Sequence, residues 1–240
     1  MQKTLKILPL RLTPHSDRTS ILNAYSREMG RVAFAVASGS GAGAARRRAL
    51  LMPLNPVEVV ASVRSGSELM TFREPRALMP LHGIMSSPER SAVALFIAEV
   101  LERVLRQSEP EPTVFDFLVD SVGRLNNPEV AAANFHLCFL VRLAAMLGIA
   151  PDPTDYRRGM VFDMVDGVFR LSMPLHGRAL SASDSGVAAL FMRMTWENQA
   201  AFRLDRKRRN EILEHILDYY SLHLADMTTL RSPSILRSPF

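Results

Sequence analysis

Short apolar segments alternate with turn residues throughout residues 1–80, which is the pattern of a sheet built from short strands. Between Val32 and Ala37 every second side chain is a large apolar one, as in a strand with one buried face. Ahead of this segment, Gly30 predicts a hairpin turn that contains a left-handed residue. The predicted strands are residues 5–12, 19–25, 32–37, 57–63 and 69–73.

From Ser87 onward the spacing of the apolar residues changes from that of a strand to that of a helix. Ser87 is a suitable N-cap for a first helix, and a second helix is expected from Thr113. A third helix, with Asn127 as its cap and Pro128 at its first position, is expected to end at Gly148. Because this third segment is apolar on nearly every face, it predicts the central helix of a bundle.

The C-terminal part of the chain combines helices with one β-hairpin. Asp166 and Gly167 lie between two apolar segments and predict a hairpin with a tight type I′ turn. Ser181 and Asp184 have the spacing of a capping box, which is a start signal of helices. The remaining expected elements are helices at 181–194 and 205–224, followed by an extended tail at 228–240 with two Ser-Pro steps.

These patterns predict an α+β protein with two domains. Residues 1–80 would form a five-stranded barrel like the oligonucleotide-binding (OB) fold, because short strands of this spacing suit a small closed or partly open barrel. Residues 81–240 would form an α-helical bundle domain with the hairpin inserted near 161–171. At 240 residues and 48% hydrophobic content, the chain is long enough to bury a substantial core.

Positive charge is concentrated in the N-terminal part of the chain. Residues 1–80 contain twelve Lys and Arg against five Asp and Glu, whereas residues 81–240 contain seventeen against nineteen. All but three of the 29 basic residues are arginines, whose planar guanidinium groups suit phosphate recognition. A barrel with this charge predicts a polyanionic partner.

The densest positive charge lies in residues 39–48, which read GSGAGAARRR. We interpret this segment as a flexible glycine loop that ends in Arg46, Arg47 and Arg48. Adjacent arginines repel one another, and a polyanion relieves that repulsion, so the loop predicts binding to the phosphates of nucleic acid. The alternative is a solvated surface loop without a ligand.

A second basic cluster lies at the start of the last predicted helix. Cations there oppose the helix dipole, whose N-terminal end favours negative charge. One explanation is a second DNA-binding surface, which would allow one molecule to hold two strands. The other is a charged helix end that Asp205 and Glu211 partly neutralise. The cluster consists of Arg203, Arg206, Lys207, Arg208 and Arg209.

The sequence contains no evident catalytic or metal-binding pattern. The single cysteine, Cys138, excludes an internal disulfide and a cysteine-based zinc site, and the histidines lack metal-ligand spacing. Gly39, Gly41 and Ala44 match a dinucleotide-binding fingerprint. However, Pro53 follows too soon for the crossover helix that this fold requires. We therefore expect no enzyme activity, no cofactor and no metal.

The sequence also lacks the pattern of a targeting or membrane-spanning segment. Pro9 and Arg11 interrupt the N-terminal apolar stretch. His136 and Arg142 interrupt the most apolar stretch, at residues 135–150. We expect a cytoplasmic, nucleoid-associated protein that makes no membrane contact.

Several short motifs resemble, in order and spacing, the bacterial RecO family of recombination mediators. They include YSREMGR at residues 25–31, RRR at 46–48, LMPLNPVE at 51–58 and NFHL at 134–137. The motifs in the helical part are similar to the Bacteroidetes branch of the family. The resemblance covers essentially the whole chain and implies an OB-fold domain followed by an α-helical domain.

The resemblance also implies a function in recombinational DNA repair. Members of this family bind single- and double-stranded DNA, anneal complementary strands and help to load the RecA recombinase in the RecFOR pathway. Their partners include RecR and the acidic C-terminal tail of single-stranded DNA-binding protein. A tail site of this kind needs an apolar pocket beside a basic residue, for which Arg142 is a candidate. DNA contacts are expected from Arg31 and from the two basic clusters.

The cysteine content departs from the family pattern. Many members hold a four-cysteine zinc knob in the helical domain, whereas this chain has only Cys138. The hairpin at 161–171 is expected in that place, without metal. Two other interpretations stay open: a protein-interaction adaptor whose basic loop has no DNA role and, less favoured, a nucleotide-dependent enzyme.

Overall fold

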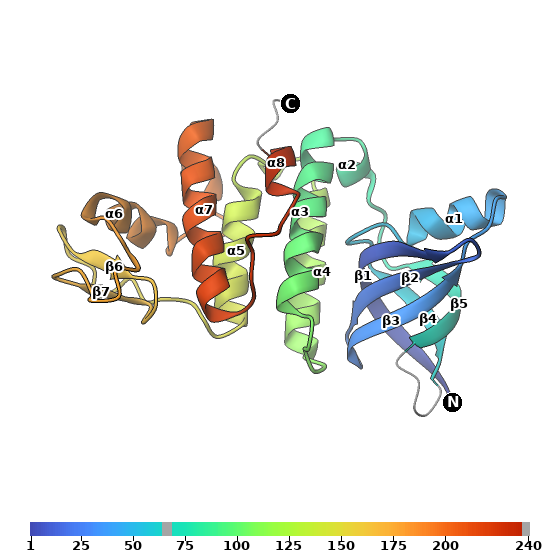
Figure 1. Ribbon diagram of the computed structural model, residues 1–240. Coiled ribbons are helices and arrows are strands. Elements are labelled where there is room, and N and C mark those ends of the chain that lie inside the picture. Colours follow the sequence, from blue (N-terminus) through green and yellow to red (C-terminus); the bar gives the residue numbers. More distant parts are fainter. Residues whose placement is uncertain (64–68, 237–240) are drawn as a thin grey trace. The chain divides into compact units, whose positions relative to one another are not determined.

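The computed structural model describes residues 1–63 and 69–236 (Figure 1). Its packing divides the chain into two compact units, which are Met1–Val130 together with the C-terminal residues from Arg231, and Ala131–Leu230. The first unit contains the β-barrel and the helices that directly follow it. The domain boundary that we expected at residue 80 stays a prediction.

Five strands form a closed barrel at the N-terminus (Figure 1). They are β1 (Gln2–Ser16), β2 (Thr19–Ser26), β3 (Gly30–Ala37), β4 (Val57–Ser62) and β5 (Leu69–Ala77). The order around the barrel is β1-β2-β3-β5-β4, and β3 with β5 is the parallel pair. Helices and a small sheet follow the barrel, so the structure confirms the predicted α+β class and the OB-like barrel.

The barrel core follows the alternation seen in the sequence. On β3, Val32, Phe34 and Val36 are buried. The ring of Phe34 meets that of Phe72 edge to face, with centroids 5.2 Å apart. Burial of each large apolar side chain stabilises the fold by roughly 1.5–3 kcal/mol. Because alternate residues face opposite ways, the side chain of Arg31 lies on the outer face of the barrel.

The turn between β2 and β3 is confirmed, and it is pressed against the chain that follows the first long helix. Gly30 is left-handed, with φ of 66°. A Cβ atom at this position would lie 2.4 Å from the carbonyl oxygen of Ser108. The backbone N–H of Arg31 donates to the same oxygen over 3.1 Å. Only glycine combines this conformation with this close approach.

Three helices come directly after the barrel in the chain, and they are α2 (His82–Met85), α3 (Pro88–Val104) and α4 (Pro112–Asn126). The hydroxyl of Ser87 accepts a hydrogen bond from the backbone N–H of Arg90, which confirms the predicted cap. α4 begins one residue before the predicted position, Thr113. α3 packs against both β1 and α4.

The third predicted helix begins later than its sequence indicates. We expected Asn127 to cap it, but α5 spans Phe135–Met146. The cause is Arg90, whose buried guanidinium holds the intervening turn. It donates to the carbonyl oxygens of Leu125, Pro128 and Val130, over 2.6, 3.1 and 2.6 Å. These contacts replace the regular ladder in which helical carbonyls accept from N–H groups four residues on.

The second unit consists of helices around a small sheet. Most side chains of α5 are buried, as expected for a central helix, and Gly148 after it is left-handed, with φ of 73°. The confirmed cap at Ser181 accepts from the N–H of Asp184 over 3.1 Å. The other elements are β6 (Val161–Asp163), β7 (Val168–Arg170), β8 (Ala179–Leu180), α6 (Ala182–Phe191), a 3₁₀ turn (Gln199–Ala201) and α7 (Arg206–His223).

The predicted hairpin is present, but its turn differs from the prediction. A type I′ turn requires positive φ at both central residues. Gly167 has φ of 68°, whereas Asp166 is absent from the described non-glycine residues with positive φ. Four residues, 164–167, connect β6 to β7. The carboxylate of Asp163 organises this longer turn by accepting from the N–H groups of Val165 and Asp166, over 3.0 and 3.1 Å.

The C-terminal segment is not extended where we expected an extended tail. Within residues 228–240, Pro233–Leu236 forms the short helix α8, and residues 237–240 lie outside the described residues. The carboxylate of Glu99 on α3 accepts from the backbone N–H groups of Arg231 and Ser232, over 3.0 and 2.8 Å. These bonds draw the segment onto α3.

Candidate nucleic-acid interface and partner pocket

The arginines that we expected in a flexible loop lie on a helix. α1 (Ala42–Leu50) contains Arg46, Arg47 and Arg48. Alanine and arginine favour helix strongly, and the glycines are concentrated at the start of this segment, with Gly41 at the N-cap. Arg47 and Arg48 occupy the last turn, where the helix dipole favours positive charge. The interpretation as a mobile loop is therefore wrong.

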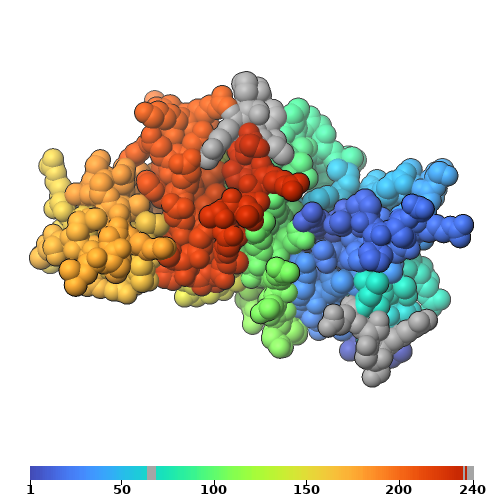
Figure 2. All heavy atoms as spheres, in the orientation of Figure 1, coloured from blue at the N-terminus to red at the C-terminus, as the bar shows by residue number. Residues whose placement is uncertain are grey.

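α1 presents most of its charge to solvent. It has no buried residue and packs on β5. In Figure 2 the light-blue atoms of α1 lie at the surface of this unit. The guanidinium of Arg48 donates to the carbonyl oxygen of Gly39 over 2.8 Å. Among the described residues, no acidic side chain pairs with Arg46 or Arg47.

Several other arginines of the barrel are neutralised by acidic side chains. Arg27 donates two hydrogen bonds to the carboxylate of Asp116, both over 2.9 Å. This pairing raises the pKa of Arg27 and holds the pKa of Asp116 below its usual value. Arg76 contacts Glu58 over 2.6 Å. The positive charge available to a ligand is therefore smaller than the composition of residues 1–80 suggests.

Arg31, which we expected to contact DNA, is mostly enclosed. Its side chain is 18% exposed, and its nearest carboxylate oxygen belongs to Glu102, 3.9 Å away. Burial lowers the pKa of Arg31, and Glu102 partly offsets this effect. Arg31 therefore offers less of its side chain to a ligand than the exposed Arg46 and Arg48 of α1.

The second basic cluster divides into structural and exposed members. Arg208 contacts Glu211 over 2.8 Å and Asp184 over 3.3 Å, and Arg209 donates to the side-chain oxygen of Asn134 over 3.2 Å. The carboxylate of Asp205 caps α7 by accepting from the N–H of Arg208 over 2.7 Å. Arg203, Arg206 and Lys207 are exposed, and Lys207 lies 3.9 Å from Glu211.

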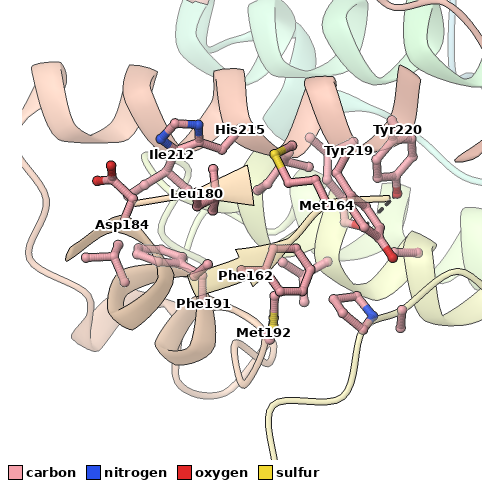
Figure 3. Close-up of a pocket in the computed structure, with 18 of the residues that line it drawn as sticks. Phe162, Met164, Leu180, Asp184, Phe191, Met192, Ile212, His215, Tyr219 and Tyr220 are labelled. Carbon is pink, nitrogen blue, oxygen red and sulfur yellow. Dashed lines mark hydrogen bonds between the residues drawn. The ribbon is translucent and has the colours of Figure 1, made fainter. Parts of the chain in front are cut away.

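An apolar pocket of about 140 Å³ lies in the second unit, between α5, α6, α7 and the small sheet (Figure 3). Figure 3 shows Phe162, Met164, Phe191 and Ile212 among its lining side chains. The charged lining residues are Arg142, Asp184 and Arg208, with His215 beside them.

Among the described cations that line the pocket, Arg142 is the one that can pair with an acidic ligand. It is exposed, and among the described residues no acidic side chain pairs with it. The carboxylate of Asp184 is already occupied by Ser181, whose hydroxyl donates over 2.7 Å, and by Arg208. These hydrogen bonds, that of Ser181 first, hold the pKa of Asp184 below its usual value. The structure thus places the predicted residue Arg142 at an apolar pocket.

Two family models match nearly the whole chain, namely Recombination protein O N terminal over residues 1–79 and Recombination protein O C terminal over residues 85–232. This chain belongs to the RecO family. The DNA repair protein RecO of Porphyromonas gingivalis is 36% identical over 98% of each chain. The DNA repair protein RecO of Phocaeicola vulgatus is 35% identical over 100% of this chain and 99% of the relative. Membership of the RecO family indicates a role in DNA repair and recombination.

The hairpin that we expected in place of the RecO zinc knob is held together by charge. Within the described residues, no group of three or more His, Cys, Asp or Glu side chains could hold a metal ion. The buried carboxylate of Asp163 instead contacts Arg170 over 2.7 Å and His176 over 3.3 Å. Arg170 also contacts Asp166. Sequence inspection missed this network because single charged residues in a hairpin have no distinctive spacing.

The aromatic side chains of this RecO-family barrel do not offer a stacking surface. Phe34 is in the core, as predicted, and Phe72 packs against it. Tyr25 is fully buried, and its hydroxyl donates to the carbonyl oxygen of Glu109 over 3.2 Å and accepts from the N–H of Glu111 over 3.1 Å. Contacts with bases therefore require other residues. Separately, none of the helices in residues 1–63 and 69–236 is long and apolar enough to span a membrane.

Proposed function

We propose that this RecO-family protein is a recombination mediator that binds single- and double-stranded DNA, anneals complementary strands and assists the loading of RecA. The observation that carries the proposal is the position of Arg46 and Arg47 on α1: Arg46 is exposed, Arg47 is half-buried, and neither has an acidic partner among the described residues. Elsewhere on the barrel, Arg27 and Arg76 are already neutralised by Asp116 and Glu58. DNA phosphates are suitable counter-ions for the arginines of α1.

Annealing requires that two strands be held close while their bases stay free to pair. A protein that contacts the sugar-phosphate backbone leaves the base edges accessible. The burial of Tyr25 and Phe34 supports backbone contacts over base stacking. We assign the first strand to α1 and the second to Arg203, Arg206 and Lys207, which are the exposed members of the C-terminal cluster.

The test is DNA binding by a variant with Arg46, Arg47 and Arg48 all changed to alanine. Fluorescence anisotropy with a labelled oligonucleotide should show weaker binding and a shallower salt dependence. Each lost phosphate contact lowers the slope of log K against log salt by about 0.7 on single strands. Arg76→Ala is the matched control, because Glu58 already neutralises Arg76. Unchanged affinity and slope in the triple variant would favour the adaptor interpretation instead.

We also propose that the pocket lined by Arg142 binds the acidic C-terminal tail of single-stranded DNA-binding protein. The support is chemical: the lining is largely apolar, and Arg142 adds a cation that no described acid neutralises. A chain end with apolar and acidic residues would fill the pocket and pair with this guanidinium. RecR is a further expected partner, for which we assign no residues.

Binding of a labelled tail peptide tests the pocket assignment. Arg142→Glu should weaken peptide binding at least tenfold, because the reversed charge repels the acidic tail. Arg157→Glu is the control, since Arg157 is exposed in the same unit and does not line the pocket. Equal losses in the two variants would mean that the peptide responds only to overall charge.

A further inference from the structure

Two arginines and one asparagine of the barrel approach one carboxylate of the first unit. Arg11 on β1 and Asn23 on β2 are paired in the sheet register, and both reach Glu102 on α3. Arg31 on β3 approaches the same carboxylate, and Arg106, just after α3, is close enough to lower the pKa of Arg31. Glu102 therefore lies between the guanidinium groups of Arg11 and Arg31, and Arg106 adds positive charge near Arg31.

The contacts of Glu102 are long compared with the ion pairs that Arg27 and Arg76 form on the same barrel. Arg11 lies 3.5 Å away, Asn23 3.4 Å away and Arg31 3.9 Å away. Arg27 and Arg76, by comparison, contact their acids over 2.9 and 2.6 Å. A carboxylate shared between several donors satisfies none of them fully.

The cluster also has an excess of positive charge. Among the described residues, no second carboxylate pairs with Arg11, Arg31 or Arg106. The Nη1 atom of Arg31 is buried and has no hydrogen-bond partner in the described structure. Arg11 and Arg106 are exposed above it, and the side chain of Arg11 is 59% exposed. A cluster of this composition can accept a further anion.

We propose that Arg11, Arg31 and Arg106 form a phosphate-binding site on the DNA-binding unit, and that Glu102 is an internal counter-ion that weakens it. A backbone phosphate of DNA approaches Arg11 and Arg106 from solvent and competes with Glu102 for them. The carboxylate limits the affinity, which lets a strand leave after annealing. This inference rests on the proposed DNA binding and adds a site that lies apart from the arginines of α1.

Glu102→Gln is the central test, because it preserves the shape of the side chain and removes its charge. The variant should bind a single-stranded oligonucleotide several-fold more tightly than the unmodified chain. Its slope of log K against log salt should steepen by about 0.7, the effect of one additional phosphate contact. Glu89→Gln is the matched control: Glu89 is exposed on the same helix, and no described arginine pairs with it. An equal gain in both variants, or no gain in Glu102→Gln, would overturn the proposal.

Arg106→Ala provides a second measurement that does not depend on how Glu102→Gln folds. Arg106 is exposed, so its removal should leave the thermal unfolding temperature unchanged. DNA affinity should fall, and the salt slope should become shallower by about 0.7. Unchanged binding would contradict the site. If the unmodified chain does not bind DNA, the proposed function is wrong. If the unmodified chain binds DNA and both variants bind it with the same affinity, only the inference about Glu102 is wrong.

Discussion

The guanidinium of Arg170 donates a hydrogen bond to the carboxylate of Asp163 over 2.7 Å, and this carboxylate is almost completely buried. Asp163 is the last residue of β6 and Arg170 the last residue of β7, so the ion pair runs diagonally between the two strands and links them. This hairpin is the one that we expected in place of the zinc knob. Burial raises the pKa of Asp163. The hydrogen bonds from Arg170 and from the turn outweigh this effect, so the pKa lies below its usual value.

Asp163→Ala should destabilise the second unit, because it removes the acceptor for Arg170 and for two backbone N–H groups. We expect the free energy of unfolding to fall by about 2–4 kcal/mol. Urea unfolding followed by circular dichroism measures this change. Asp166→Ala is the control, since Asp166 is exposed and its ion pair should contribute little. Because the pKa of Asp163 is lowered, its contribution should be complete at neutral pH and should disappear as the pH falls below about 4.

His136 should make the protein sensitive to mild acid. It is buried on α5, and burial, with a smaller effect of Arg209, lowers its pKa from 6.5 to about 3. The unfolded chain therefore binds a proton that the folded chain excludes, and stability is lost as the pH falls below 6.5. The loss should reach about 2 kcal/mol at pH 5.

His136→Gln should abolish this part of the pH dependence, whatever its effect on stability at neutral pH. The measurement is the free energy of unfolding in urea at several pH values between 5 and 8. His82→Gln serves as the control because His82 is exposed. A pH profile that stays the same in His136→Gln would show that other groups cause the acid sensitivity.

Glu99 should control the attachment of the C-terminal segment to α3. Its carboxylate accepts from two backbone N–H groups and from the hydroxyl of Ser232. Glu99→Ala should release the segment and accelerate tryptic cleavage after Arg231 several-fold, as followed by mass spectrometry. Glu89→Ala should leave the cleavage rate unchanged. Similar rates in both variants would mean that other contacts hold the segment.

Tyr25 should affect stability without affecting DNA binding. Its buried hydroxyl bridges Glu109 and Glu111, so Tyr25→Phe should lower the free energy of unfolding by about 1–3 kcal/mol. If bases do not stack on the barrel, affinity for a single-stranded oligonucleotide should stay the same, and homopolymers of thymine and adenine should bind alike. A large loss of affinity in a folded Tyr25→Phe variant would contradict the backbone-contact mechanism.

Elements that depend on local chemistry were predictable from the residues. The alternation around Phe34 indicated a barrel strand, and Gly30 indicated the left-handed turn. Ser87 and Ser181 marked the starts of two helices. Each of these features is determined by residues within a few positions in the chain. Such residues can be read directly from the sequence.

The two main failures have different causes. Asn127 had the pattern of a helix cap, but Arg90, from another helix, holds the carbonyl groups of that turn. Glycines suggested a loop at residues 39–48, although the alanines and arginines beyond Gly41 form a helix. At Asn127 tertiary contacts override the local signal. At residues 42–50 the helix propensity of alanine and arginine, which is a local property, outweighs the glycines.

For the candidate DNA-binding site, too, the sequence predicted one part and only the structure showed the other. Composition alone located the positive charge in the barrel and identified the arginines at residues 46–48. It could not show which arginines are neutralised, because Asp116 lies 89 residues from Arg27 in the chain and Glu102 lies 91 residues from Arg11. Charge is a property of each residue, whereas its availability to a ligand is a property of the distances between residues. Folding sets those distances, and with them the difference between an exposed Arg46 and an enclosed Arg31.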